Sequence, residues 1–160
     1  MDFLSFYDLY FDDVYRYIYF KTGNQWDTDD LVSAVFLKAF EKFPSVTGSH
    51  KAWLFTIARN TVIDHYRKKK DITVGEDMER YTYLYCFEEE LEKQDEVNCL
   101  KKSLGALTKE ELELINLRYF AELKYWEIGQ LTGKTENAVK LKFMRVKEKL
   151  KALVKVCMEG

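Results

Sequence analysis

The sequence predicts an all-α protein made of two small helical modules joined by an acidic linker. One proline and seven glycines in 160 residues leave long stretches without a residue that breaks helices. Apolar residues recur every three or four positions near both ends of the chain. The formal charge is +1 over residues 1–70, −8 over 71–98 and +5 over 99–160. We therefore expect modules at 1–70 and 99–160, with 71–98 as the linker.

The first module is expected to hold three or four helices, and the residue pattern marks three of them. Apolar side chains run from Phe3 to Ile18 at helical spacing, and Gly23-Asn24 ends that helix. The second helix follows residues 27–30, whose side-chain oxygens suit the free N–H groups of a helix start. The third runs from about Lys51 to Lys70. Its inward face is predicted to consist of Leu54, Phe55, Ala58 and Val62.

The last third of the chain has the pattern of a helix-turn-helix. Residues 108–111 form a capping-box sequence, and a short helix is expected over 125–132. Gly133-Lys134 is predicted to turn the chain, and Thr135 to cap a long final helix. Gly129 is expected where the two helices cross closely. A basic, exposed second helix predicts binding in the DNA major groove, although an ordinary helical hairpin with a solvated basic face is the alternative.

The third helix carries a second candidate site. Trp53, Asn60, Asp64 and Arg67 combine an aromatic ring with hydrogen-bonding and basic groups, and Lys68, Lys69 and Lys70 follow. That mixture suits partly single-stranded DNA, whose bases offer flat faces to a ring. A tryptophan packed in the core and a solvated basic tail are equally compatible with the pattern alone.

Several classes of function are disfavoured. No run reaches the length of a membrane span and no signal-peptide layout precedes the first helix, so we expect a cytoplasmic protein without membrane insertion. Cys86, Cys99 and Cys157 match no zinc or disulfide spacing, which predicts buried or incidental thiols. His50 and His65 lack a catalytic or metal-binding setting. We therefore expect neither an enzyme, nor a metal site, nor a cofactor.

Longer strings of residues resemble the sigma-70 family, in its extracytoplasmic-function branch. Residues 30–40 and 52–64 resemble region 2, and residues 107–150, including Leu117-Arg118-Tyr119-Phe120 and Ala138-Val139-Lys140, resemble region 4. Two such strings in this order, on either side of a short linker, are more specific than either alone. The resemblance implies a sigma factor that binds core RNA polymerase and directs promoter recognition and DNA melting, with an anti-sigma factor as a further partner.

The resemblance also implies roles for single residues. The second helix would face polymerase, and the 44–50 loop and third helix would meet the −10 element. The residues implied for polymerase are Asp30, Leu31, Phe36 and Lys38. Those for the −10 strand are Trp53, Asn60, Asp64 and Arg67. Those for the −35 duplex are Asn137, Lys140, Leu141, Lys142 and Arg145.

The chain departs from the family at Ser33-Ala34, where Gln-Glu is typical. That pair normally makes polar contacts with polymerase, so other side chains must supply them or the contact must change. The acidic linker would thread through polymerase near the RNA path. We expect its charge to mimic nucleic acid there.

Two rival functions remain open from the sequence. A transcriptional regulator with a response-regulator output domain shares the C-terminal pattern, but it has no need of a melting surface such as residues 53–64. A protein-interaction module that binds polymerase or an anti-sigma factor without touching DNA is the second rival. Dependence of transcription on both core polymerase and promoter DNA separates the three.

Overall fold

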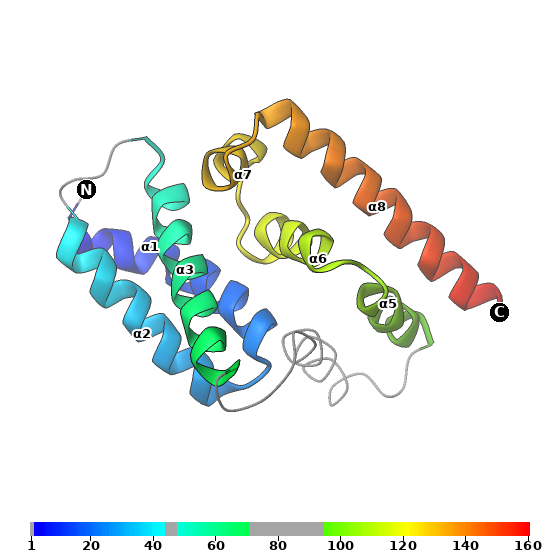
Figure 1. Ribbon diagram of the computed structural model, residues 1–160, viewed down its shortest axis with the longest axis horizontal. Coiled ribbons are helices and arrows are strands. Elements are labelled where there is room, and N and C mark those ends of the chain that lie inside the picture. The colour runs from blue at the N-terminus through cyan, green and yellow to red at the C-terminus, as the bar shows by residue number, and fades with distance from the viewer. Residues whose placement is uncertain (1, 44–47, 71–94) are drawn as a thin grey trace.

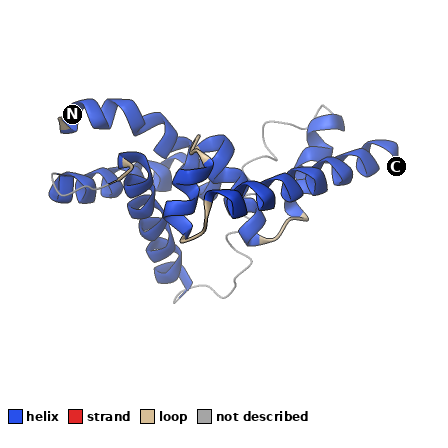
Figure 2. Ribbon diagram, turned by 90° about the horizontal axis from the view of Figure 1, so that it is seen from above, coloured by secondary structure: helices blue, strands red, loops and turns tan. Residues whose placement is uncertain are grey.

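Helices make up every regular element that the structure describes, which confirms the predicted all-α class. Figure 1 shows the computed structural model, and Figure 2 shows helices joined by short loops. The structure describes residues 2–43, 48–70 and 95–160. The first module contains α1 (Phe3–Thr22), α2 (Gln25–Lys42) and α3 (His50–Lys70). The second contains α5 (Asp95–Gly105), α6 (Lys109–Ile115), the π-helical turn η2 (Asn116–Phe120), α7 (Tyr125–Thr132) and α8 (Glu136–Glu159).

An aromatic-rich core holds the first module together. α1 packs on α2, and α2 packs on α3. The predicted inward face of α3 is confirmed, because Leu54, Phe55, Ala58 and Val62 are each at most 1% exposed. The ring of Phe55 meets the ring of Tyr17 edge-on, with their centroids 5.3 Å apart. Each large side chain buried in this way stabilises the fold by about 1.5–3 kcal/mol relative to an exposed one.

The boundary between α1 and α2 follows from two neighbouring residues. Gly23 takes a left-handed conformation with φ of 71°, as a helix end favours, and its N–H donates to the Tyr19 carbonyl. Asn24, rather than the Asp27 cluster, caps α2. Its Oδ1 accepts from the backbone N–H of Asp27 at 2.8 Å, and its Nδ2 donates to Asp27 Oδ2 at 3.0 Å. The helix therefore begins at Gln25, earlier than predicted.

The predicted helix-turn-helix is confirmed in its local details. Thr108 and Glu111 accept each other's backbone N–H groups, which completes the capping box before α6. Thr135 caps α8 by accepting from the N–H of Ala138 at 3.1 Å. A Cβ added at Gly129 would stand 2.5 Å from the carbonyl oxygen of Lys134, so no larger residue fits there without a shift. The sequence did not predict η2, the π-helical turn that follows α6.

The prediction of free thiols was wrong for two of the three cysteines. Cys99 in α5 and Cys157 in α8 form a disulfide across a sequence separation of 58 residues, with their Cα atoms 5.6 Å apart. Spacing rules missed the pair because the two cysteines meet only when α5 packs against α8. Cys86 lies outside the described residues.

The expected linker is shorter at its C-terminal end than predicted. Helix α5 begins at Asp95, so residues 95–98 belong to the second module rather than to the linker. Asp95 and Glu96 stand in the first turn, where negative charge favours a helix start. The hypothesis that the linker mimics nucleic acid falls on residues 71–94, outside the described residues.

The two modules pack against each other, and we call this packing the closed arrangement. Helix α1 lies against η2, and α3 lies against α7 (Figure 1). The rings of Phe20 and Phe120 stack with centroids 4.5 Å apart. Glu113 accepts from the Tyr17 hydroxyl at 2.6 Å and pairs with the Lys21 ammonium at 2.5 Å. Asn116, fully buried, donates its amide to the Tyr17 carbonyl at 3.0 Å.

This boundary between the modules is more polar than a protein core. The oxygen of the same Asn116 amide, Oδ1, is buried and has no hydrogen-bond partner among the residues that the structure describes. A buried polar atom of this kind costs free energy, as does a buried ion pair that must be stripped of water. Polar boundaries of this type are typical of two domains of one chain that can move relative to each other.

Candidate nucleic-acid interface

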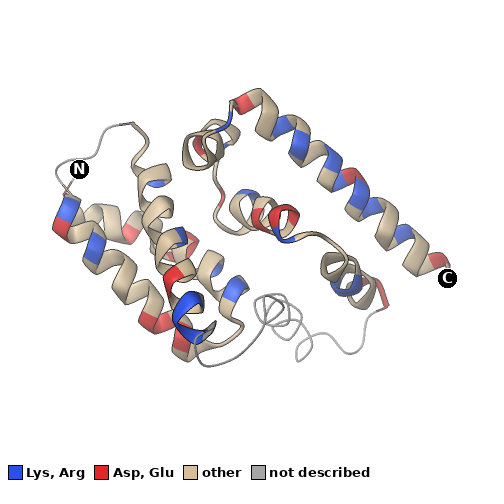
Figure 3. Ribbon diagram, in the orientation of Figure 1, with Lys and Arg blue, Asp and Glu red and all other residues tan. Residues whose placement is uncertain are grey.

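One exposed face of α8 gathers most of the residues predicted to read duplex DNA. At 3.6 residues per turn, Asn137, Lys140, Leu141 and Arg145 fall on one side of the helix. All four are exposed, with Leu141 at 48%. The opposite stripe, Val139, Phe143 and Val146, is at most 4% exposed and packs inward. Figure 3 shows basic residues along α8, so the helix presents positive charge to solvent.

Lys142 differs from the other four predicted residues. It lies beside the buried stripe of α8, and its Nζ pairs with Glu110 of α6 at 3.0 Å. Glu110 keeps its charge readily, because the hydrogen bond and the charge of Lys142 lower the pKa of its carboxyl. In the closed arrangement Lys142 therefore does not share the exposed face of Asn137 and Lys140.

The polar end of α3 forms a second exposed surface. Asn60, Asp64 and Arg67 are all exposed, and a loose ion pair of 3.7 Å joins Asp64 to Arg67. Both partners are more than half exposed, so the pair contributes little to stability and leaves Arg67 available. Lys68 is exposed on the same final turns. These residues stand where the sequence predicted them.

Trp53 is partly buried rather than freely presented. Its ring lies 6.1 Å from the ring of Phe6 in α1 and packs against the core. The packing of this tryptophan against the core is thus confirmed in part, and part of its surface remains exposed. Its contact with a nucleic-acid base stays a prediction.

The face of α2 predicted to meet polymerase needs a correction. Leu31 and Phe36 are only 6% and 4% exposed, so their side chains form core rather than surface. The exposed large apolar residues of this helix are instead Trp26 in its first turn, at 84%, and Leu37 and Phe40 farther along, at 61% and 60%. The sequence carried the signal, because Phe36 shares the inward helical face with Val32, Val35 and Ala39.

The rest of that face is polar and exposed. Asp30 and Lys38 are both exposed, and Lys38 donates to the hydroxyl of Thr61 in α3 at 3.2 Å. Ser33 is exposed and Ala34 half-exposed, so the departure from the family pattern lies on this same surface. Exposed apolar side chains rimmed by polar ones are typical of a protein-binding site.

Both histidines lie on α3, His50 at its start and His65 near its end. Within residues 2–43, 48–70 and 95–160, no three His, Cys, Asp or Glu side chains gather as a metal site would require. His65 lies 4.0 Å from Asp27, and burial, with the nearby charge of Lys69, lowers its pKa. Its surroundings thus favour the neutral imidazole. Over the same ranges, no helix is both long enough and apolar enough for a bilayer.

Comparisons with known proteins agree with this geometry. Residues 6–72 match the family model described as sigma-70 region 2, and residues 98–150 match the model described as sigma-70, region 4. The chain is 30% identical to the ECF RNA polymerase sigma factor SigM of Bacillus subtilis over 149 residues, which cover 92% of this chain and 91% of that protein. It is 32% identical to the ECF RNA polymerase sigma factor BldN of Streptomyces coelicolor over 140 residues. That match covers 84% of this chain but only 53% of BldN.

Solved structures share the fold. The sigma factor RpoE from Bartonella quintana, solved with the anti-sigma factor NepR, superposes with a TM-score of 0.68 at 23% identity, covering 97% of this chain and 98% of that one. CnrH, solved with the cytosolic domain of CnrY, gives a TM-score of 0.69 at 22% identity over 96% and 88% of the two chains. The two family models, the relatives that match along most of their length and the two-module helical fold place this chain in the sigma-70 family, in its extracytoplasmic-function branch.

Proposed function

We propose that the chain acts as a sigma factor through three separate surfaces, one on each of α2, α3 and α8. The protein binds core RNA polymerase and directs promoter recognition and DNA melting. The observation that carries the proposal is the presence of two exposed nucleic-acid-type surfaces, on α3 and α8, in one chain that matches both region 2 and region 4. A regulator of the response-regulator type needs only the second of these.

The α8 surface suits the −35 element as duplex DNA. Lys140 and Arg145 can reach phosphates or guanine edges, and Asn137 can pair with adenine, while Leu141 offers an apolar contact to a thymine methyl. We assign Lys142 to this surface only when its pair with Glu110 opens. The module that carries this surface runs from α5 to α8.

The α3 surface suits the −10 element as one strand separates. Asn60 and Asp64 supply hydrogen-bonding groups and Arg67 attracts phosphate, while Trp53 offers the open part of its ring for stacking. The first module, over residues 1–70, thus combines strand capture with polymerase binding. We place the polymerase contact on Asp30 and Lys38, with Leu37 and Phe40 as its apolar centre and with Leu31 and Phe36 supporting it from inside.

The closed arrangement must open before both promoter elements are bound. The −10 and −35 positions are about 25 base pairs apart, or about 85 Å of straight duplex. Arg59 of α3 and Lys134, just before α8, line the same cavity. Along α3, Arg59 lies within about 20 Å of Arg67, and along α8, Lys134 lies within about 20 Å of Arg145. The two surfaces are therefore within about 50 Å of each other, which is too near to span the promoter.

We infer that this opening offers a point of control. RpoE and CnrH were solved with NepR and the cytosolic domain of CnrY, respectively, and an anti-sigma factor is likewise our proposed partner for this chain. We place the protein in the cytoplasm, where polymerase works. Its proposed mechanism is recognition and strand capture, with no bond made or broken by its own side chains and no cofactor.

Run-off transcription tests the proposal. The assay mixes core polymerase with a panel of promoter fragments taken from the neighbourhood of the gene for this protein. Each reaction is run with and without the protein. We expect specific transcripts only when all three components are present. DNA binding that does not depend on core polymerase would support a regulator instead, and core binding without any promoter-specific transcript would support an interaction module.

A further inference from the structure

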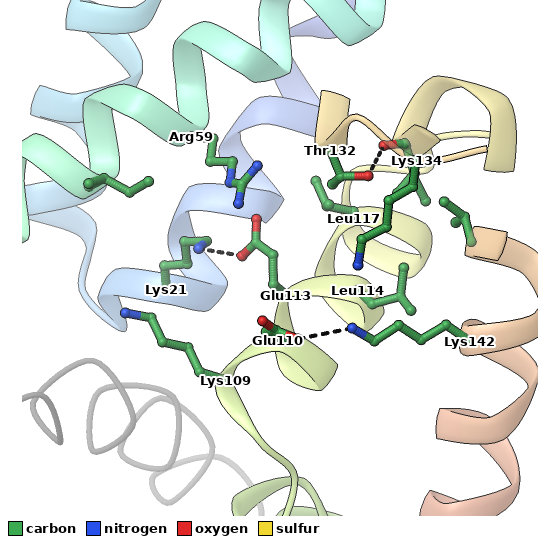
Figure 4. A pocket seen from close by; sticks show the side chains of 13 residues that line it. Lys21, Arg59, Lys109, Glu110, Glu113, Leu114, Leu117, Thr132, Lys134 and Lys142 are labelled. Atoms are coloured by element: carbon green, nitrogen blue, oxygen red, sulfur yellow. Dashed lines mark hydrogen bonds and ion pairs between the residues drawn. The ribbon is translucent and has the colours of Figure 1, made fainter. Parts of the chain in front are cut away.

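A cavity of about 470 Å³ lies at the boundary between the two modules. Helices α1 and α3 form one side of it, and α6, α7 and α8 form the other (Figure 4). Its volume falls within the range of sites that bind small molecules. Part of its wall is apolar and consists of Ile63, Leu114, Leu117, Ile128 and Val139.

Positive charge predominates in this cavity. Five basic side chains line it, against the two carboxylates of Glu110 and Glu113, which leaves a formal excess of three positive charges. The basic residues come from five different segments: Lys21, Arg59, Lys109, Lys134 and Lys142. The walls of the cavity are close together and partly shielded from water. Repulsion between these basic side chains is therefore screened less than it would be on an open surface.

Both carboxylates are already engaged by two of these cations. Glu113 pairs with Lys21, whose side chain is 5% exposed, and Glu110 pairs with Lys142. Arg59 and Lys134 form no ion pair with any residue in the described part of the chain. Figure 4 shows both side chains reaching into the cavity from opposite modules. The charge of Lys134 also helps to lower the pKa of the Glu110 carboxyl, although the two groups form no ion pair. An anion placed between Arg59 and Lys134 would add counter-charge to a cavity whose lining has more cations than carboxylates.

We propose that this cavity binds a small phosphorylated molecule with a flat apolar ring, of the nucleoside polyphosphate class. Its phosphates would lie between Arg59 and Lys134, where two cations from opposite modules converge. Its ring would lie along the apolar wall of Leu117, Ile128 and Val139. A single inorganic phosphate would use the cations but leave most of the cavity unfilled.

Such a ligand would favour the closed arrangement. Its effect on transcription rests on the proposed function, in which the two modules must separate. The complete site exists only while α3 and the α7–α8 turn face each other. A ligand at one hundred times its dissociation constant that binds only the closed arrangement favours that arrangement about a hundredfold. The bound molecule would therefore hold the chain away from polymerase and promoter.

Isothermal titration calorimetry on the full-length protein tests the site. The probes are ATP, GTP, pyrophosphate and adenosine, without added metal. We expect ATP or GTP to bind, pyrophosphate to bind more weakly and adenosine not to bind. Arg59→Gln and Lys134→Gln should each weaken binding about tenfold, because each removes one charged contact. Lys155→Gln, which removes an exposed lysine of α8 outside the cavity, should leave binding within about twofold.

Three results would overturn the proposal. The first is no measurable binding of either nucleotide. The second is binding that both cavity variants leave unchanged while circular dichroism shows them folded. The third is pyrophosphate binding as tightly as the nucleotides, since the apolar wall would then play no part.

A competition experiment separates this proposal from the sigma-factor function itself. Binding of labelled protein to core polymerase is followed by fluorescence anisotropy, with and without the nucleotide that binds. We expect the nucleotide to weaken the binding of the wild type and of Lys155→Gln to core polymerase. Its effect on the binding of Arg59→Gln or Lys134→Gln should be much smaller. If core binding is normal and insensitive to nucleotide, only the coupling fails. If core binding is absent while calorimetry shows the site, the sigma-factor proposal fails and the ligand site stands.

Discussion

Helices α3 and α8 are both proposed to read promoter DNA, but they differ in how packing and reading are divided. On α8 the inward stripe of Val139, Phe143 and Val146 is separate from the exposed side of Asn137 and Lys140. On α3 the division is incomplete, because Trp53 packs partly against Phe6 while the final turns are exposed. Where the packing residues and the DNA-reading residues lie on separate sides of a helix, the sequence alone identifies them. Where one residue could do either, the packing of neighbouring helices must be known before its role can be assigned.

The two modules also differ in what holds them together. The first relies on an aromatic-rich core, whereas the second adds the Cys99–Cys157 disulfide between α5 and α8. Each difference gives an experiment that acts on one region and spares the other. The expected effects fall from about 4 kcal/mol to below 1 kcal/mol.

Breaking the disulfide should have the largest effect and should act on the second module. Closing a loop of 58 residues stabilises a fold by about 4 kcal/mol in the chain-entropy model. Urea unfolding of Cys99→Ser with Cys157→Ser, compared with wild type, measures the loss. Cys86→Ser is the control for losing a thiol. If dithiothreitol destabilises the double variant as much as the wild type, the disulfide is not the cause.

Removing Glu113 should open the boundary between the modules. Glu113→Ala removes the buried ion pair with the Lys21 ammonium and the hydrogen bond from the Tyr17 hydroxyl, at a cost of about 3 kcal/mol. Tyr17→Phe, which removes only one hydrogen bond, should cost about 1 kcal/mol. Small-angle X-ray scattering should show a larger radius of gyration for Glu113→Ala. An unchanged radius together with full stability would mean that this pair does not hold the modules closed.

The two reading helices should respond differently to the loss of one positive charge. Lys140→Ala should weaken duplex binding by about 1 kcal/mol and lower the slope of log K against log salt by about 1. Arg67→Ala should instead impair strand opening, followed by permanganate reactivity, and leave −35 binding intact. Lys142→Ala serves as the comparison on α8, because its pair with Glu110 turns it away from the exposed face. Equal losses for Lys140→Ala and Lys142→Ala would contradict that distinction.

The smallest effect concerns the start of α2. The amide of Asn24 and the ammonium of Lys69 lower the pKa of Asp27 below its usual value. A lowered carboxyl pKa adds stability above the unfolded value near 3.8, and that stability is lost as the pH falls through the folded pKa. Asp27→Asn should therefore cost less than about 1 kcal/mol at pH 7. Thermal unfolding from pH 7 to pH 2.5 should show the difference from wild type disappear at the acid end.

Several features of the candidate site were predictable because they depend on local chemistry. The capping box at Thr108, the turn at Gly133 and the exposed face of α8 each arise from residues within a few positions of one another. The polymerase face of α2 was predicted only in part. Leu31 and Phe36 are apolar like Leu37 and Phe40, and only their position around the helix distinguishes core from surface.

The sequence by itself determined most of the helices, the caps at Thr108 and Thr135 and the resemblance to both sigma regions, because these depend on short-range spacing and residue type. Tertiary structure alone decided the disulfide, the closed arrangement and the cavity between the modules. Cys99 and Cys157 stand 58 positions apart, and Lys21 and Glu113 come from different modules. Such pairs form only when packing brings distant segments together, and no local pattern records that event.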